Sequence, residues 1–131
     1  MRDWLYILNP KAKTVNGENH TKDGLLKLAE TAPERDWWLS RPRHIAAGDR
    51  IWIYLSSPVK EVAAMAEVEG EPYEVTDTDY PWRFSVVLHL QATRALCQAP
   101  VTLSALANRH PQGVTGVKPD DLELLRKHAG L

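Results

Sequence analysis

Runs of consecutive apolar residues, separated by turn residues, recur along the chain. Residues 4–8 (WLYIL) and 50–55 (RIWIYL) are apolar at almost every position, which predicts two strands that are buried on both faces. Turn residues bound both runs, because Asn9 follows the first and Gly48 precedes the second. Residues 82–90 (WRFSVVLHL) predict a third, long strand, and the pattern allows it to extend towards Leu96.

Residues 61–69 (EVAAMAEVE) fit two kinds of structure. Ala, Met and Glu favour a helix, but Val62, Ala64, Ala66 and Val68 alternate along the segment as in a strand. We expect a strand, because small side chains let a sheet curl tightly enough to close. Residues 73–76 are expected to continue the pairing after a break at Gly70.

Three segments carry the boundary signals of helices. Thr21 can cap a helix that Pro33 stops, and residues 102–106 can form a short one. Pro119 at a first helical position opens a last helix, which Gly130 ends. With the strands, these helices predict one mixed domain of the α/β (α+β) class over residues 1–131, a compact barrel of four or five strands with small helices at each end.

The charge balance excludes some partners and leaves others. Sixteen Lys and Arg against 17 Asp and Glu give a net charge of -1, which differs from the positive excess of a non-specific duplex binder. Any nucleic-acid contact must therefore come from a local patch. Cys97 is the only cysteine, which excludes an internal disulfide and fits a reducing compartment. No apolar run approaches the ~20 residues that cross a bilayer, so we expect a cytoplasmic protein without membrane contact.

The sequence carries none of the common signatures of metal, phosphate-loop or nucleophile chemistry. Gly113 and Gly116 lack the Lys and Ser of a phosphate loop, and no nucleophile elbow is present. We therefore expect no cofactor and no catalytic residue. The histidines have no paired spacing for a metal, so each is expected to be a surface or capping residue: His20, His44, His89, His110 and His128.

Aromatic side chains gather where loops and strands are expected to meet. Trp37 and Trp38 lie in a segment that we expect to be a loop, beside Arg41 and Arg43, and Trp82 begins the long strand. Two or three rings can enclose a nucleobase, with each stacking contact contributing on the order of 1–3 kcal/mol. Arginines nearby would meet its phosphates. The alternative for each tryptophan is a place in the core.

Several short motifs follow one another in order along nearly the whole chain. They are WLYILNP, the segment from Trp37 to Tyr54, AAMAEVEGEPY, YPWR and the PDDL of the last predicted helix. In this order they resemble the EVE domains of the PUA-like superfamily, which are relatives of the YTH readers of methylated adenine. Two positions depart from the family pattern, since Trp38 replaces a small residue and residues 9–11 replace Lys-Ser-Glu-Pro.

The resemblance implies a curled barrel of five or six strands with flanking short helices. It also implies a non-enzymatic module that binds DNA or RNA and takes a modified nucleobase into an aromatic pocket. We expect a monomer whose downstream effect lies in a separate protein. Carried over by position, the cage candidates are Trp37, Trp38 and Trp82, and the polar edge would hold Asn9, Ser40 and Tyr54.

Two other functions remain open from the sequence. ASCH-type domains of the same superfamily include hydrolases of acylated nucleosides, which use a Thr, a Lys and a Glu in the pocket mouth. This chain contains all three residue types, but nothing in the sequence assigns particular ones to that role. An exposed aromatic surface would instead indicate a protein-interaction module.

Overall fold

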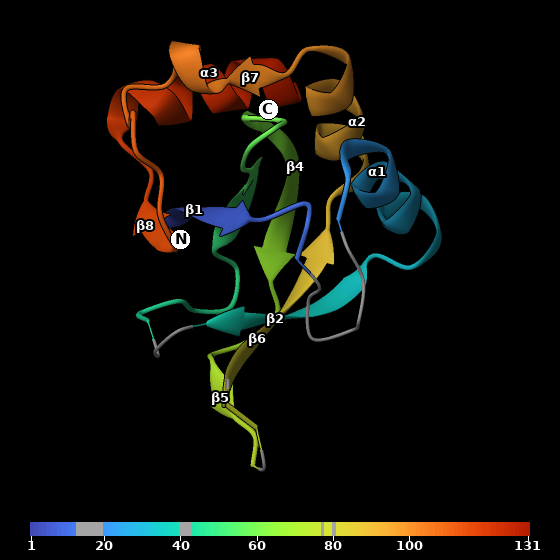
Figure 1. Ribbon diagram of the computed structural model, residues 1–131, viewed down its shortest axis with the longest axis vertical. Helices are drawn as coiled ribbons and strands as arrows, with labels where there is room; N and C mark the ends of the chain where they lie inside the picture. The colour runs from blue at the N-terminus through green and yellow to red at the C-terminus, as the bar shows by residue number, and fades with distance from the viewer. Residues whose placement is uncertain (13–19, 40–42, 77, 80) are drawn as a thin grey trace.

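A curled sheet of eight strands lies at the centre of the computed structural model (Figure 1), which describes residues 1–12, 20–39, 43–76, 78–79 and 81–131. The main path runs β2-β6-β4-β3-β1-β8, while β5 pairs with β6 and β7 with β4. β1 and β3 are parallel, and the other pairs are antiparallel. The strands are β1 (Asp3–Leu8), β2 (Glu34–Leu39), β3 (Arg50–Leu55), β4 (Glu61–Val68), β5 (Tyr73–Glu74), β6 (Trp82–Leu88), β7 (Val101–Thr102) and β8 (Val114–Gly116).

Three α-helices and one short 3-10 helix accompany the sheet. Thr21 Oγ1 accepts a hydrogen bond from the Gly24 backbone nitrogen at 3.0 Å and so caps the first helix as predicted. The last helix begins at Pro119 and ends at Gly130, whose φ of 74° is left-handed. The helices are α1 (Lys22–Thr31), α2 (Leu90–Gln98) and α3 (Pro119–Ala129), with the 3-10 helix η1 (Leu103–Ala105).

The sheet has a separate apolar core on each face, because alternate side chains of its strands point in opposite directions. The inner core fills the curl and includes Ile51, Ile53 and Leu55 of β3. The outer core lies under α2 and α3 and includes Trp52 and Tyr54 of the same strand. Both faces of β3 are thus buried, which explains its almost continuous apolar sequence.

Two predicted elements are wrong. The segment around Trp37 is strand β2 and not a loop, because it pairs along its full length with β6 and buries Trp37 and Leu39. The long strand ends at Leu88 and does not extend towards Leu96. His89 Nδ1 accepts a hydrogen bond from the Ala92 backbone nitrogen at 3.1 Å and caps helix α2. Among the described residues, no helix is both long and apolar enough to span a membrane.

Candidate functional site

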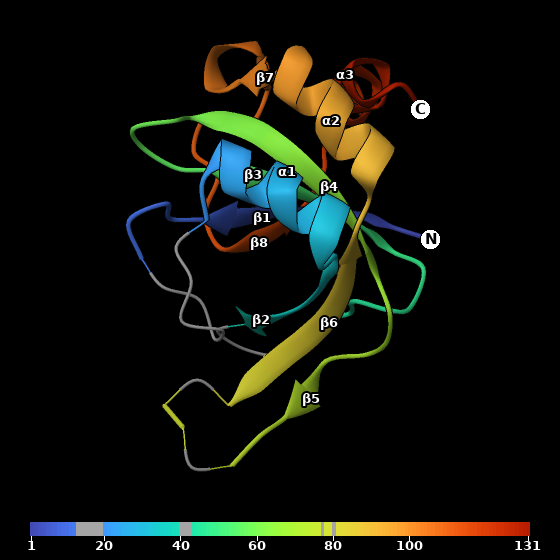
Figure 2. The ribbon, with the colours of Figure 1, turned by 90° about the vertical axis from the view of Figure 1, so that its right-hand side faces the viewer.

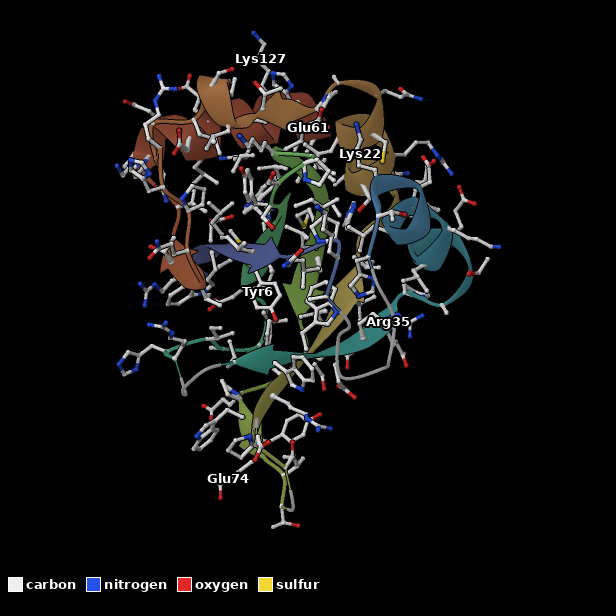
Figure 3. The ribbon with its side chains drawn as sticks, viewed as in Figure 1. Tyr6, Lys22, Arg35, Glu61, Glu74 and Lys127 are labelled. Carbon is white, nitrogen blue, oxygen red and sulfur yellow. The ribbon has the colours of Figure 1, made fainter. Side chains whose placement is uncertain are left out.

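Four aromatic rings pack against one another, and three of them belong to the inner core. Figure 3 labels one of these three, Tyr6 of β1. Tyr6 and Trp37 stack with their ring centroids 5.4 Å apart and their planes 7° from parallel. Phe84 lies edge-on to both, and His20 lies edge-on to Trp37 with a centroid distance of 5.8 Å. We call Tyr6, His20, Trp37 and Phe84 the ring cluster. Edge-on and stacked contacts of this kind add stability beyond burial.

Hydrogen bonds hold the ring cluster in place. The Tyr6 hydroxyl donates to the backbone carbonyl of Trp38 at 2.7 Å and so joins β1 to β2. Burial raises the pKa of Tyr6 well above its usual value, so the hydroxyl stays protonated and donates. Trp37 Nε1 donates to His20 Nε2 at 3.3 Å. Because that nitrogen accepts, a neutral His20 carries its proton on Nδ1.

The structure separates the three predicted cage tryptophans. Trp37 has no exposed surface and belongs to the inner core. Trp82 is partly buried against the same core, diagonally across the β2–β6 pair. Trp38 pairs with Arg83 in the register, so its side chain lies on the other face of the sheet. Trp37 and Trp82 can therefore share one site, and Trp38 cannot join them without a change of register.

Tyr54 does not lie at the edge of this site. Its neighbours in sequence, Ile53 and Leu55, belong to the inner core, while Tyr54 itself belongs to the outer core beneath the helices. Alternation along β3 therefore sends its hydroxyl away from the ring cluster, which corrects the sequence expectation. Burial raises the pKa of Tyr54 above its usual value.

The predicted polar and basic residues also separate. Asn9 is exposed at the end of β1, and its side-chain oxygen accepts from the Lys11 backbone nitrogen at 2.9 Å, as in a turn. Arg43 is half-buried and lines a surface hollow of about 380 Å³ together with Ile45 and Glu71. Ser40 and Arg41 lie outside the described residues.

Sequence reasoning missed three members of the ring cluster. Tyr6 and Phe84 were assigned to strands but not to a site. His20 was expected at the surface, but it is 1% exposed and is held by Trp37. Its position immediately before the helix cap Thr21 was the one available signal, because α1 starts there and packs into the inner core through Leu25 and Ala29. Burial of His20 depends on β2, which is distant in sequence.

A second polar cluster lies where α1 meets the start of β4. Lys22 Nζ and Glu61 Oε2 form an ion pair at 2.7 Å (Figure 3). Cys97 lies within electrostatic range of this pair, and burial raises the pKa of its thiol. Thr21 precedes Lys22, but its hydroxyl oxygen already caps α1. In the part of the chain that the structure describes, no three His, Cys, Asp or Glu side chains are placed to hold a metal ion.

Solved structures of similar fold exist, although sequence comparison finds no relative: no family model matches the chain, and no curated protein matches it. The protein Atu2648 from Agrobacterium tumefaciens is 15% identical with a TM-score of 0.67, covering 100% of this chain and 94% of that one. Rpa0253 from Rhodopseudomonas palustris is 19% identical with a TM-score of 0.63, covering 99% and 94%. ASCH from Zymomonas mobilis is 16% identical with a TM-score of 0.58, covering 96% and 94%.

At these identities the likeness concerns the fold alone. The curled sheet with three short helices matches the ASCH structure over nearly the whole length of both chains. The chain therefore has a PUA-like fold of mixed α and β structure, which confirms the fold class predicted from its sequence. The sheet has eight strands where five or six were predicted, because two two-residue strands, β5 and β7, pair beside its main path.

Proposed function

We propose that this chain is a nucleic-acid-binding domain of the EVE type, which holds one modified base of DNA or RNA against the ring cluster without transforming it. The observation that carries the proposal is the packing of four aromatic rings around Trp37. The PUA-like fold and the order of the sequence motifs support it. We further propose that it acts in the cytoplasm as a monomer with a separate effector protein.

Binding on this proposal requires the ring cluster to open. Trp37 has no exposed surface, so a base reaches it only after Tyr6 releases the Trp38 carbonyl. An extruded base then stacks on Trp37 and Trp82, and each contact contributes about 1–3 kcal/mol. His20 and Tyr6 would supply polar groups that read the base edge once they exchange their present hydrogen bonds for bonds to the base.

The proposal is tested with two matched tryptophan variants. Trp37 and Trp52 are both without exposed surface, and each donates a hydrogen bond from Nε1, but they lie on opposite faces of the sheet. Fluorescence quenching by 5-methylcytidine and N6-methyladenosine would measure binding to each variant. We expect Trp37→Leu to weaken binding about tenfold, the loss of one stacking contact, and Trp52→Leu to leave it unchanged.

Equal affinity of the Trp37→Leu and Trp52→Leu variants would show that the ring cluster does not bind the base. Because Trp37→Leu alters the core, Trp82→Leu serves as a milder second variant, since Trp82 is only partly buried. It is expected to weaken binding as well. Absence of binding by the unmodified protein to every modified nucleoside tested would refute the proposed function.

Hydrolysis of acylated nucleosides is the second candidate function. The Lys22–Glu61 ion pair beside Thr21 favours it, because it brings together the three residue types that the ASCH hydrolases use. The Thr21 hydroxyl oxygen accepts the hydrogen bond from Gly24 that caps α1, and this argues against Thr21 as a free nucleophile. Release of acetate from N4-acetylcytidine, abolished in Glu61→Gln, would establish this activity. No release by the unmodified protein would exclude it for this substrate.

A further inference from the structure

A basic hollow of about 390 Å³ lies on the surface where the β3–β4 turn meets β7 and η1. Two of the side chains that line it are cationic, two carry hydroxyls and two are apolar. We call it the β3–β4 hollow, and its lining residues are Val59, Lys60, Thr102, Leu103, Ser104 and Arg109.

The backbone holds the two sides of this hollow together. The Leu103 backbone nitrogen donates to the Lys60 carbonyl at 2.9 Å, directly beside the pairing of β4 with β7. Lys60 has a φ of 55°, a left-handed conformation that is uncommon for a residue other than glycine. Such a conformation persists where surrounding structure determines it, and it recurs at ligand sites. Thr102 and Ser104 lie on the opposite wall, with their hydroxyl oxygens 3.0 Å apart.

The charge of the hollow is positive although that of the chain is not. None of its six lining residues is acidic. Among the described residues, neither Lys60 nor Arg109 forms an ion pair. Glu61 follows Lys60 in sequence, but Lys22 holds its carboxylate at 2.7 Å. The two cations can pair with the negatively charged oxygens of a phosphodiester, and the hydroxyl pair can donate a hydrogen bond to one of them.

The hollow lies at the same edge of the sheet as the end of β1. The Ser56 backbone nitrogen donates to the Leu8 carbonyl at 3.0 Å, and Leu8 pairs with Leu55. Figure 2 shows the β3–β4 turn and the end of β1 on one side of the molecule. β7 pairs with the first residues of β4, directly after the turn. Tyr6 of the ring cluster is two residues before Leu8. A nucleic-acid chain that leaves the ring cluster along β1 would run towards this hollow.

We propose that the β3–β4 hollow binds a backbone phosphate of the nucleic acid whose base the ring cluster holds. The inference rests on the proposed function, because the ring cluster supplies the base. Lys60 and Arg109 neutralise the phosphate, and one hydroxyl of the Thr102–Ser104 pair donates a hydrogen bond to one of its oxygens while it accepts from the other hydroxyl. The apolar side chain of Leu103 contacts the adjoining sugar.

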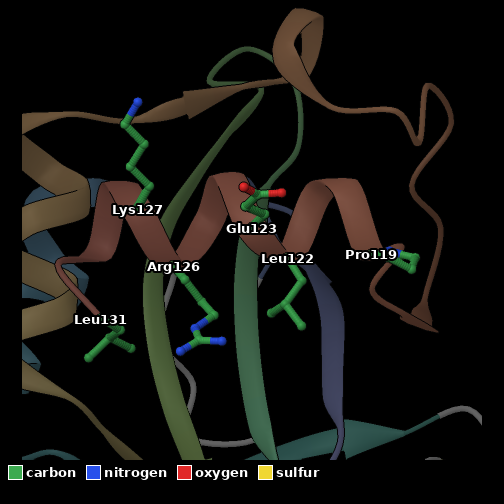
Figure 4. A pocket seen from close by; sticks show the side chains of 6 residues that line it. All are labelled: Pro119, Leu122, Glu123, Arg126, Lys127 and Leu131. Atoms are coloured by element: carbon green, nitrogen blue, oxygen red, sulfur yellow. The ribbon is translucent and has the colours of Figure 1, made fainter.

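The test compares a double variant of the hollow with one elsewhere on the surface. Lys60→Gln/Arg109→Gln removes two charges from the hollow. Arg126→Gln/Lys127→Gln removes two charges from a hollow of about 510 Å³ on α3, which also contains Glu123 (Figure 4). Labelled single-stranded DNA and RNA of about eight nucleotides, a length typical of single-strand sites, would carry one 5-methylcytosine or N6-methyladenine. Fluorescence anisotropy measures their affinity at several salt concentrations, and quenching measures that of the free nucleosides.

We expect the Lys60/Arg109 variant to bind the oligonucleotide about tenfold more weakly. The slope of log affinity against log salt concentration should also be shallower by about 0.7, as for one lost phosphate contact on a single strand. Its affinity for the free nucleoside, which has no phosphate, should not change. The α3 variant should retain both affinities. If nucleosides bind but the two double variants bind oligonucleotides equally well, phosphate binding in the hollow is refuted and the proposed function stands. If nucleosides do not bind the unmodified protein, the proposed function fails and the inference with it.

Discussion

Asp49 is the residue that fastens the start of the chain to the turn before β3. Its buried carboxylate accepts hydrogen bonds from the Arg2 backbone nitrogen at 2.9 Å and from Trp4 Nε1 and the Ala46 backbone nitrogen at 3.0 Å. The sequence marks this position only as part of a Gly-Asp turn. Its three partners come from two segments, and this makes the carboxylate a structural link.

The pH dependence of stability should report this link. Burial by itself raises the pKa of Asp49, but the hydrogen bonds and the charge of the N-terminus hold it below the usual value of 3.8. The unfolded chain therefore takes up the proton first, so the contribution is present above pH 3.8 and is lost as the pH falls through the folded pKa. We expect Asp49→Asn to cost about 2 kcal/mol in urea unfolding at pH 7.

The same substitution should flatten the decline in stability below about pH 4. Glu74→Gln, at an exposed position, is the control, and it should leave both the neutral-pH stability and the acid slope unchanged. An Asp49→Asn protein with the full acid slope would show that another carboxylate causes the decline.

At the scale of elements, local signals located boundaries better than they distinguished loop from strand. Thr21 and Gly130 mark the helix ends as predicted, because capping depends on neighbouring atoms. β2 was missed because its residues carry no clean alternation, and its extended shape comes from pairing with β6. The sequence after Leu88 becomes helical once His89 caps α2.

The end of α3 provides a prediction at this scale. Gly130 has a φ of 74°, and its backbone nitrogen reaches the carbonyls of the last turn. A side chain is strained in this conformation, so Gly130→Ala should lower the free energy of unfolding by about 1 kcal/mol. Gly70→Ala is the control, since Gly70 has no positive φ and no atom lies within 4 Å of the added Cβ. Equal effects in the two variants would contradict the role of backbone conformation.

At the scale of the whole molecule, one sheet separates two cores. The inner core contains Trp37, and the outer core contains Trp52. β1, β3 and β4 contribute side chains to both, so neither core can lose its packing while these strands stay ordered. The two cores should therefore unfold together.

Urea unfolding would check this expectation. The chain has five tryptophans, so Phe replaces Trp4, Trp38 and Trp82 in both variants. On this background, Trp37→Phe leaves Trp52 alone to report the outer core, and Trp52→Phe leaves Trp37 alone to report the inner one. In each variant, the midpoint from tryptophan fluorescence should coincide with that from far-ultraviolet circular dichroism. A fluorescence midpoint that departs from the dichroism midpoint in either variant would show that one core melts separately.

The sequence by itself determined the main strands, the ends of the first and last helices and the curled mixed fold. Apolar runs, turn residues and caps act over a few residues, so their effects can be read locally. Only the tertiary structure decided the membership of the candidate site. It placed Trp37 inside and Trp38 outside, buried His20 and turned Tyr54 to the other core. These outcomes depend on which strands pair and in which register, and contacts between distant segments set both.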